Sequence, residues 1–210
     1  MMKVFIMLCL TLVVSACTLL KPVLVTPVST YTLTGVNQNK LVKSPAAVSM
    51  LVTMPTASPG YQSTAMIYVT QPLQLSAFAQ HRWVAPPAQM LQPLLVTSLR
   101  NTQWFSAVVM SPFSGSTDLR LETELVKLQQ NFLVQPSEVE LVLQVVLMNN
   151  ATNRVIATKR FSATIATKAD NPYAGVVAAN QAVTQVMQQL AAFVVLTQKT
   201  GNVALPTPIS

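Results

Sequence analysis

Charged residues, glycine, histidine and cysteine are all scarce in this 210-residue chain. Charged side chains make up 9% of the sequence against 51% hydrophobic residues, so the chain is not a charge-rich disordered segment. Five glycines provide no glycine-rich phosphate loop. One histidine and two cysteines are too few for a zinc or iron–sulfur site built from these ligands. The length suits one domain with a substantial core.

The first sixteen residues have the layout of an export signal. A basic start, Met1-Met2-Lys3, precedes an apolar run over residues 4–13, and small residues follow it. The run is about half of the ~20 apolar residues that a bilayer-spanning helix needs. We therefore expect residues 1–16 to be a signal peptide.

Cys17 gives this signal a more specific meaning. One interpretation is a plain secretory signal with a cysteine there by chance, but Val14-Ser15-Ala16-Cys17 resembles the bacterial lipobox. That resemblance implies cleavage before Cys17 and attachment of diacylglycerol to its thiol. Because Cys9 leaves with the signal, the mature chain has no free thiol and no disulfide. Thr18 differs from the aspartate of an inner-membrane retention signal, which favours the outer membrane of a Gram-negative cell.

Composition divides the mature chain into three parts. Residues 17–29 form a lipidated, proline-containing tether, residues 30–199 form the domain, and residues 200–210 lack periodicity and form a flexible tail. The mature chain keeps 12 basic and 6 acidic side chains, a formal charge of +6. Its basic residues are too dispersed for a nucleic-acid-binding stripe. They fit attraction to an anionic lipid surface or an acidic partner, or scattered solvated charge.

Hydrophobic periodicity predicts an α/β fold, a single domain with a mixed six- to seven-stranded sheet and two main amphipathic helices. The expected strands lie at residues 48–54, 65–69, 73–78, 104–110, 119–125, 139–147 and 154–165. A turn-rich stretch at residues 149–153 makes the last two strands a long antiparallel hairpin.

Two proline-marked segments predict the helices. The first begins at Pro86-Pro87 and should be bent by Pro93. The second begins after Asn171, which can cap it, with Pro172 in the first turn. The apolar face of the first consists of Met90, Leu91, Leu94, Leu95 and Leu99. The core-facing stripe of the second consists of Tyr173, Val176, Val177, Val183, Met187, Leu190, Ala191 and Val194.

Several short motifs together resemble the auxiliary lipoproteins of ABC-type transport systems, the PqiC-like family. They are Tyr31-Thr32-Leu33, Val52-Thr53-Met54-Pro55, Ala65-Met66-Ile67-Tyr68, the segment from Arg82 to Leu91 (RWVAPPAQML), Trp104 to Val109 (WFSAVV), and the late helix from Tyr173 to Val194. The resemblance spans roughly residues 30 to 195. The chain departs from the pattern at Pro93 and in its acid-free first half.

The resemblance implies a non-enzymatic lipoprotein on the periplasmic face of the outer membrane. It would have no cofactor beyond the covalent lipid at Cys17, with palmitate among its acyl chains. It would dock a periplasm-bridging complex that contains an MCE-domain protein and transports lipids or hydrophobic solutes. A homo-oligomer is possible, with Ala178, Ala179 and Ala182 packing against a second copy. The alternative is a periplasmic lipid-binding carrier, which needs an apolar cavity of about 300–1,000 Å³.

The remaining candidate residues carry weak chemical signals. Arg82 and Trp83 are candidates for partner binding, although Trp83 is more typical of a core residue. His81 lacks the G-x-S-x-G elbow of a hydrolase and is expected to be structural or solvated. Glu122 with Glu124, and Glu138 with Glu140, are spaced for paired carboxylates on a strand. We expect them to be solvated or paired with Arg154, Lys159 or Arg160, and predict no catalytic or metal site.

Overall fold

The computed structural model describes residues 27–41 and 46–201. In chain order the elements are β1 (Ser29–Tyr31), β2 (Ser49–Val52), β3 (Thr56–Ala57), β4 (Ala65–Gln71), β5 (Gln74–Trp83), α2 (Pro87–Asn101), β6 (Ala107–Met110), β7 (Leu119–Asn131), β8 (Glu138–Asn149), β9 (Val155–Ala166) and α3 (Pro172–Gly201). The expected signal peptide, Cys17, most of the tether and residues 202–210 of the tail lie outside the described residues.

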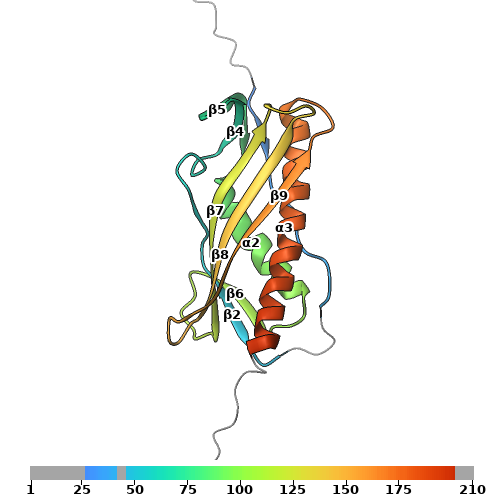
Figure 1. Cartoon of the computed structure of the whole chain (residues 1–210). Coiled ribbons are helices and arrows are strands. Elements are labelled where there is room, and N and C mark those ends of the chain that lie inside the picture. The colour runs from blue at the N-terminus through green and yellow to red at the C-terminus, as the bar shows by residue number, and fades with distance from the viewer. Residues whose placement is uncertain (1–26, 42–45, 202–210) are drawn as a thin grey trace, which may run out of the picture.

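The described residues form one mixed sheet of nine strands, organised around the long strand β7 (Figure 1). One edge of β7 pairs with β8 in antiparallel register over nearly its whole length. Its other edge pairs in parallel with β2, β3 and β4 at successive points. β5 and β1 extend the sheet beyond β4, and β6 extends it beyond β2. The predicted class is confirmed, with a sheet larger than the six to seven strands expected.

The hairpin of β8 and β9 agrees closely with the sequence pattern. Val139, Leu141, Leu143, Val145 and Leu147 alternate along β8 and are all buried. β9 pairs with β8 in antiparallel register after a turn that includes Asn153 at positive φ. The predicted hairpin is confirmed, because alternation with period two places one apolar row on the covered face.

Both helices cover the same face of the sheet, α3 over β8 and β9 and α2 beside β6 and β2 (Figure 1). The predicted start of α2 at Pro87 is confirmed, and the helix runs through Pro93, which is exposed. At the start of α3 the Asn171 side chain accepts a hydrogen bond of 2.9 Å from the backbone N–H of Ala174, as the predicted cap requires.

The predicted core stripe of α3 is wrong at two positions. Tyr173 is 64% exposed and Val177 is also exposed, because they lie on the side of the helix that faces away from the sheet. Ala178, Ala179 and Ala182 are buried in this chain's own core instead. Their small side chains let α3 approach the sheet closely, so this face is not available to a second copy.

Several boundaries also differ from the expected ones. The strand expected over 48–54 is shortened to β2, Ser49–Val52, and the two-residue β3 follows Pro55, outside the expected range. The strand expected over 104–110 begins only at Ala107. Helix α3 extends to Gly201, into the segment expected to be a loose tail.

A strap formed by residues 32–41 crosses the outside of both helices. The backbone N–H of Thr34 donates to the Asn180 side chain of α3 at 2.7 Å. Further along, the N–H of Asn37 donates to the Ser98 hydroxyl of α2 at 2.9 Å. The sequence pattern gave no sign of this segment, since it has no regular secondary structure. It ties the start of the domain to both helices.

Candidate functional site

His81 lies beside aromatic rings and not beside a nucleophile. Its Nδ1 atom is 3.1 Å from the Tyr31 hydroxyl, and the two rings stack with centroids 5.9 Å apart. The Phe78 ring meets the imidazole edge-on at 6.1 Å. These contacts join β1 to β5, which is the structural role expected for this histidine.

The four glutamates lie on the sheet face that the helices leave open. Glu122 pairs with Arg120 at 2.9 Å, and Glu140 pairs with Lys127 at 3.1 Å. The expected partners Arg154, Lys159 and Arg160 are therefore wrong for both. Glu122 finds a cation two positions away on its own strand, and Glu140 finds one on the neighbouring strand β7.

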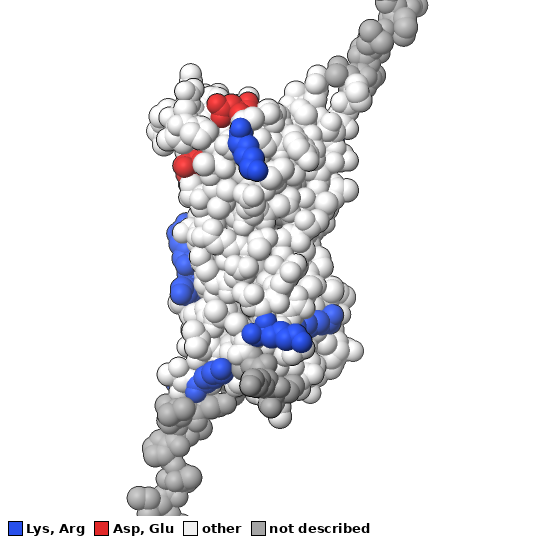
Figure 2. Space-filling view, turned by 90° about the vertical axis from the view of Figure 1, so that its right-hand side faces the viewer, with Lys and Arg blue, Asp and Glu red and all other residues white. Residues whose placement is uncertain are grey.

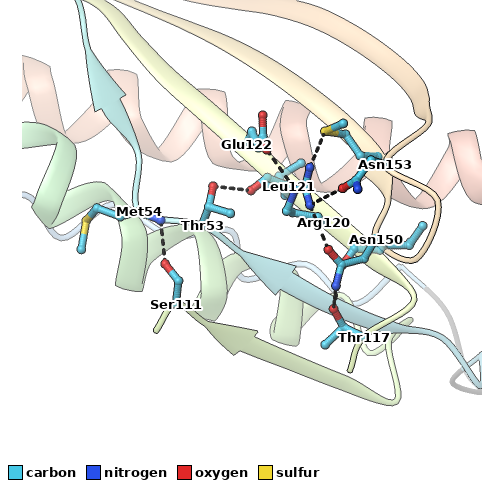
Figure 3. A network of polar contacts seen from close by, with 11 residues as sticks. Thr53, Met54, Ser111, Thr117, Arg120, Leu121, Glu122, Asn150 and Asn153 are labelled. Atoms are coloured by element: carbon cyan, nitrogen blue, oxygen red, sulfur yellow. Dashed lines mark hydrogen bonds and ion pairs between the residues drawn. The ribbon is translucent and has the colours of Figure 1, made fainter. Parts of the chain in front are cut away.

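Arg120 is the centre of a polar network at the lower end of β7 (Figure 3). Besides Glu122, its guanidinium donates to the side-chain oxygens of Asn150 and Asn153 in the β8–β9 turn, at 3.2 and 2.9 Å. Asn150 in turn donates to the Thr117 hydroxyl at 2.9 Å. The guanidinium is thus fully engaged in holding the turn against β7, and no open carboxylate pair remains there for acid–base chemistry.

Glu124 and Glu140 are also bound to neutral donors. The Ser58 hydroxyl donates to Glu124 at 2.6 Å, and the Gln129 amide donates to Glu140 at 2.8 Å. Tyr61 donates to the Gln129 side-chain oxygen at 2.6 Å. Burial, followed by the nearby Glu140 charge, raises the pKa of Tyr61, because both disfavour the phenolate. This tyrosine is therefore a neutral hydrogen-bond donor that closes the network.

Two aspartates also hold loops in place by accepting hydrogen bonds. Hydrogen bonds from the Ser49 hydroxyl and N–H lower the pKa of Asp118 below its usual value. The Ser137 N–H lowers the pKa of Asp170, which it contacts at 2.8 Å. In both cases the donors stabilise the carboxylate form. Across residues 27–41 and 46–201, no cluster of three or more His, Cys, Asp or Glu side chains is arranged to hold a metal ion.

Trp83 and Arg82 lie at the end of β5 with opposite exposures. Trp83 is 4% exposed and packs in the main core cluster, which favours the core-packing interpretation of this residue. Arg82 is exposed beside it. A partner contact by Arg82 stays a prediction.

The hollows in the described part of the chain range from a small one beside Trp83 to open surface grooves. The hollow beside Trp83 is half open to the surface and measures about 20 Å³, room for one water molecule. A groove of about 750 Å³ runs between β9 and the second half of α3. Its wall is mainly apolar, and Lys159 stands at its edge with its ammonium 5.3 Å from the Phe161 and Phe193 ring centroids. The hydrophobic pattern of the sequence did not predict this groove, although Ile156 and Leu196 are apolar residues outside the predicted stripes.

The longest helix does not have the composition of a membrane span. Within the described ranges, no helix is both long and apolar enough to cross a bilayer. Figure 2 shows the side of the molecule on which α3 and the strap lie: it is mostly uncharged, its acidic residues are at the upper end, and most of its basic residues are in the lower half.

Several solved structures share this fold, among them two that match it over most of the chain. A Xanthomonas campestris protein assigned to the DUF330 family is 19% identical, with a TM-score of 0.76 over 84% of this chain and 100% of that chain. A second, uncharacterized protein is 17% identical, with a TM-score of 0.64 over 80% and 99%. The PelC dodecamer from Paraburkholderia phytofirmans is 10% identical, with a TM-score of 0.43 over 77% and 93%, too distant to inform on assembly. No curated protein matches the chain.

The fold and its surfaces define a one-sheet α/β protein that offers grooves and loop ends for contact with other molecules. The family model of the ABC-type transport auxiliary lipoprotein component matches residues 31–191, and the chain belongs to this family. The family consists of auxiliary, envelope-located lipoproteins of transport systems, and it is a non-catalytic family. The resemblance described from the sequence is confirmed.

Proposed function

We propose that this chain is an outer-membrane lipoprotein that docks the distal end of a periplasm-bridging lipid or hydrophobic-solute transport complex. Lipid on Cys17 holds it on the periplasmic face, and its partner is an MCE-domain protein of the same system. The observation that carries the proposal is the family match over residues 31–191. The lipobox-like residues Val14 to Cys17 supply the anchor.

The distribution of charge supports docking of a partner at the lower end. Lys40, Arg100, Arg154 and Lys199 lie towards the end at which α2 and α3 finish, whereas the described chain begins at the opposite end (Figures 1 and 2). A basic end attracts an acidic partner surface and raises the rate of encounter. This placement fits the acidic-partner interpretation better than attraction to the anchoring membrane.

The partner claim is tested by cross-linking in whole cells. The tagged full chain is cross-linked in intact envelopes and purified, and the proteins captured with it are identified. We expect an MCE-domain protein and components of an ABC transporter. Their absence, when the tagged chain is lipidated and abundant, would contradict the docking role.

The two cysteines provide a matched test of the anchor. Cys17→Ser should abolish palmitate labelling and release the chain from the membrane fraction, because each buried acyl methylene contributes ~0.8 kcal/mol to membrane residence. Cys9→Ser lies in the expected signal and should leave both unchanged. Equal fractionation of the two variants would contradict a lipid at Cys17.

The groove between β9 and α3 favours a second candidate function, a carrier that binds lipid itself. Its volume of about 750 Å³ and apolar wall suit an acyl chain, and Lys159 would meet a lipid phosphate. Native mass spectrometry of the Cys17→Ser chain distinguishes the two functions. A carrier retains added lipid mass, and Lys159→Gln should weaken that retention. A docking protein shows no such adduct.

A further inference from the structure

Two loop tips at the upper end of the sheet expose apolar side chains. They are the β4–β5 turn, residues 71–75, and the β7–β8 loop, residues 132–136, which we call the tip pair. Leu73 is fully exposed, and Leu75, Leu133 and Val134 are exposed by 47%, 48% and 42%. Exposed apolar side chains that gather on one surface mark a contact site.

Leu73 is unfavourable in its place for two independent reasons. Its φ of 67° lies in the left-handed region, where glycine or asparagine is the ordinary choice in a turn. Its side chain is also fully exposed to solvent and does not pack in the core. Leu73 therefore carries a conformational cost in the backbone and a cost of exposing an apolar side chain to water. The folded domain alone compensates neither, which points to a partner outside the domain.

The tip pair is presented as one rigid unit. The backbone N–H of Phe132 donates to the Val69 carbonyl at 2.9 Å, which joins the two loops at their bases. The Phe132 ring also meets the rings of Tyr68 and Phe78 edge-on, with centroids 6.0 and 6.3 Å apart. The apolar tips therefore stand side by side at the upper end of the molecule (Figure 1).

No charged residue occurs in either tip, whereas the turn at the opposite end of the sheet reads Asn-Asn-Ala-Thr-Asn-Arg over residues 149–154. The nearest charged residue along the chain is Glu138, the first residue of β8, and Lys168 and Asp170 belong to the β9–α3 loop beyond β8. Apolar residues are exposed at the lower end too, including Phe113 and Val155, but these two belong to separate segments of the chain. The tip pair gathers four exposed apolar side chains in two adjacent loops that hold no charged residue.

The start of the described chain lies at the same end as the tip pair (Figure 1). Nine residues, 18–26, separate Cys17 from it, and nine residues span at most ~32 Å. A lipid on Cys17 would therefore keep this end of the domain next to the bilayer.

We propose that the tip pair inserts into the lipid surface to which Cys17 anchors the chain, as a second membrane contact that orients the domain. This inference rests on the proposed anchor. With the tips in the bilayer interface, the long axis of the sheet stands away from the membrane, and the basic lower end faces the periplasm. Leucine side chains in this position exchange water for acyl chains, which offsets their exposure in the free domain.

Site-specific dye labelling tests the insertion, because the lipidated mature chain has no free thiol. Leu73→Cys, Leu133→Cys and the control Thr152→Cys, in the opposite turn, are each labelled with an environment-sensitive dye. The lipidated proteins are placed in phosphatidylethanolamine–phosphatidylglycerol vesicles, and intact mass verifies the lipid. We expect a shift of emission to shorter wavelength and quenching by brominated lipid at positions 73 and 133, and neither at position 152.

The outcomes separate this inference from the anchor itself. Lipid mass at Cys17 with water-like emission at positions 73 and 133 overturns the insertion and leaves the anchor intact. Missing lipid mass at Cys17 overturns the anchor and, with it, the inference. Equal emission shifts at positions 73 and 152 indicate adsorption without orientation and also overturn it.

Leu73→Asn is the variant least able to harm the fold, because asparagine tolerates positive φ. In the Cys17→Ser background, where no covalent lipid anchors the chain, it should weaken association with the same vesicles by about tenfold, equivalent to ~1.4 kcal/mol. Val155→Asn, at the opposite end, should leave the association unchanged. An equal effect of both substitutions would contradict insertion through the tips.

Discussion

Asp118 stands at the start of β7, where its carboxylate accepts hydrogen bonds of 2.7 and 2.6 Å from the N–H and hydroxyl of Ser49. In return the Asp118 N–H donates to the Ser49 oxygen at 3.1 Å. This reciprocal contact joins β2 to β7 across 69 residues of chain. At the scale of single residues, the polar side chains of this protein mostly act in this way, as ties between strands and loops.

The Asp118 contact predicts a pH dependence of stability. Because the donors lower the pKa of Asp118 from 3.8, the carboxylate stabilises the fold above pH ~4, and this contribution is lost as the pH falls through the lowered pKa. Asp118→Asn should cost about 0.5–1 kcal/mol at pH 7, since the site is exposed and screened, and less at pH ~2, where more of the carboxylate is protonated. Thermal unfolding midpoints at both pH values measure this.

Ser49→Ala is the matched variant for that prediction. It leaves the carboxylate but removes one of its donors, so the pKa of Asp118 should rise towards its usual value and the pH dependence should flatten. A pH dependence unchanged in both variants would show that this contact does not contribute.

Gly35 lies where the strap approaches the backbone of α3 closely enough to exclude a side chain. A Cβ atom there would lie 2.6 Å from the Asn180 carbonyl oxygen and 2.7 Å from the Thr184 nitrogen, both backbone atoms of α3. Gly35→Ala should therefore displace the strap and cost about 1–3 kcal/mol in urea unfolding. Gly115→Ala is the control, because its Cβ would meet the ring of Phe113, an exposed side chain that can move aside. Equal costs would contradict the close approach of the strap.

At the scale of elements, α2 shows how packing overrides propensity. Pro93 removes one backbone hydrogen-bond donor from the middle of the helix. The helix continues because Leu91, Leu95 and Leu99 are fully buried on its other side, and burying three leucines outweighs one lost bond. Gln92 adds hydrogen bonds of 3.2 Å from its side-chain amide to the carbonyls of Val52 and Ser111.

Pro93→Ala should consequently stabilise the protein. The substitution restores a hydrogen bond to the Gln89 carbonyl at an exposed position, and we expect a gain of about 1–2 kcal/mol after the greater entropy of the unfolded chain is deducted. Thr97→Ala, exposed one turn later, should change stability by about 0.5 kcal/mol or less. Urea unfolding of the two variants makes the comparison, and a loss of stability on Pro93→Ala would show that α2 requires the proline.

At the scale of the whole molecule, the two ends of the sheet differ in chemistry. The upper end has the charge-free tip pair and the start of the described chain, and the lower end gathers basic residues (Figures 1 and 2). This polarity fits a protein that contacts lipid at one end and a partner at the other. The function we propose needs both contacts at once.

The two ends should therefore capture different molecules in cells. A photo-cross-linking amino acid in place of exposed Phe113, near the lower end, should yield adducts with a protein of the transport system. The same group in place of Leu73 should yield lipid adducts and no protein adduct. Gel analysis of the two variants distinguishes these outcomes, and protein adducts at Leu73 alone would reverse the proposed orientation.

Local patterns in the sequence were enough to predict the α/β class, helices α2 and α3, and the β8–β9 hairpin, because alternation and helical spacing depend on near neighbours in the chain. The parallel pairing of β2, β3 and β4 along β7, the strap over both helices, the partners of Glu122 and Glu140 and the adjacent loop tips were decided only by the tertiary structure. Each of these features depends on contacts between groups that are held together by the rest of the fold. The local hydrophobic period does not specify which of many distant or competing partners gives the lowest free energy.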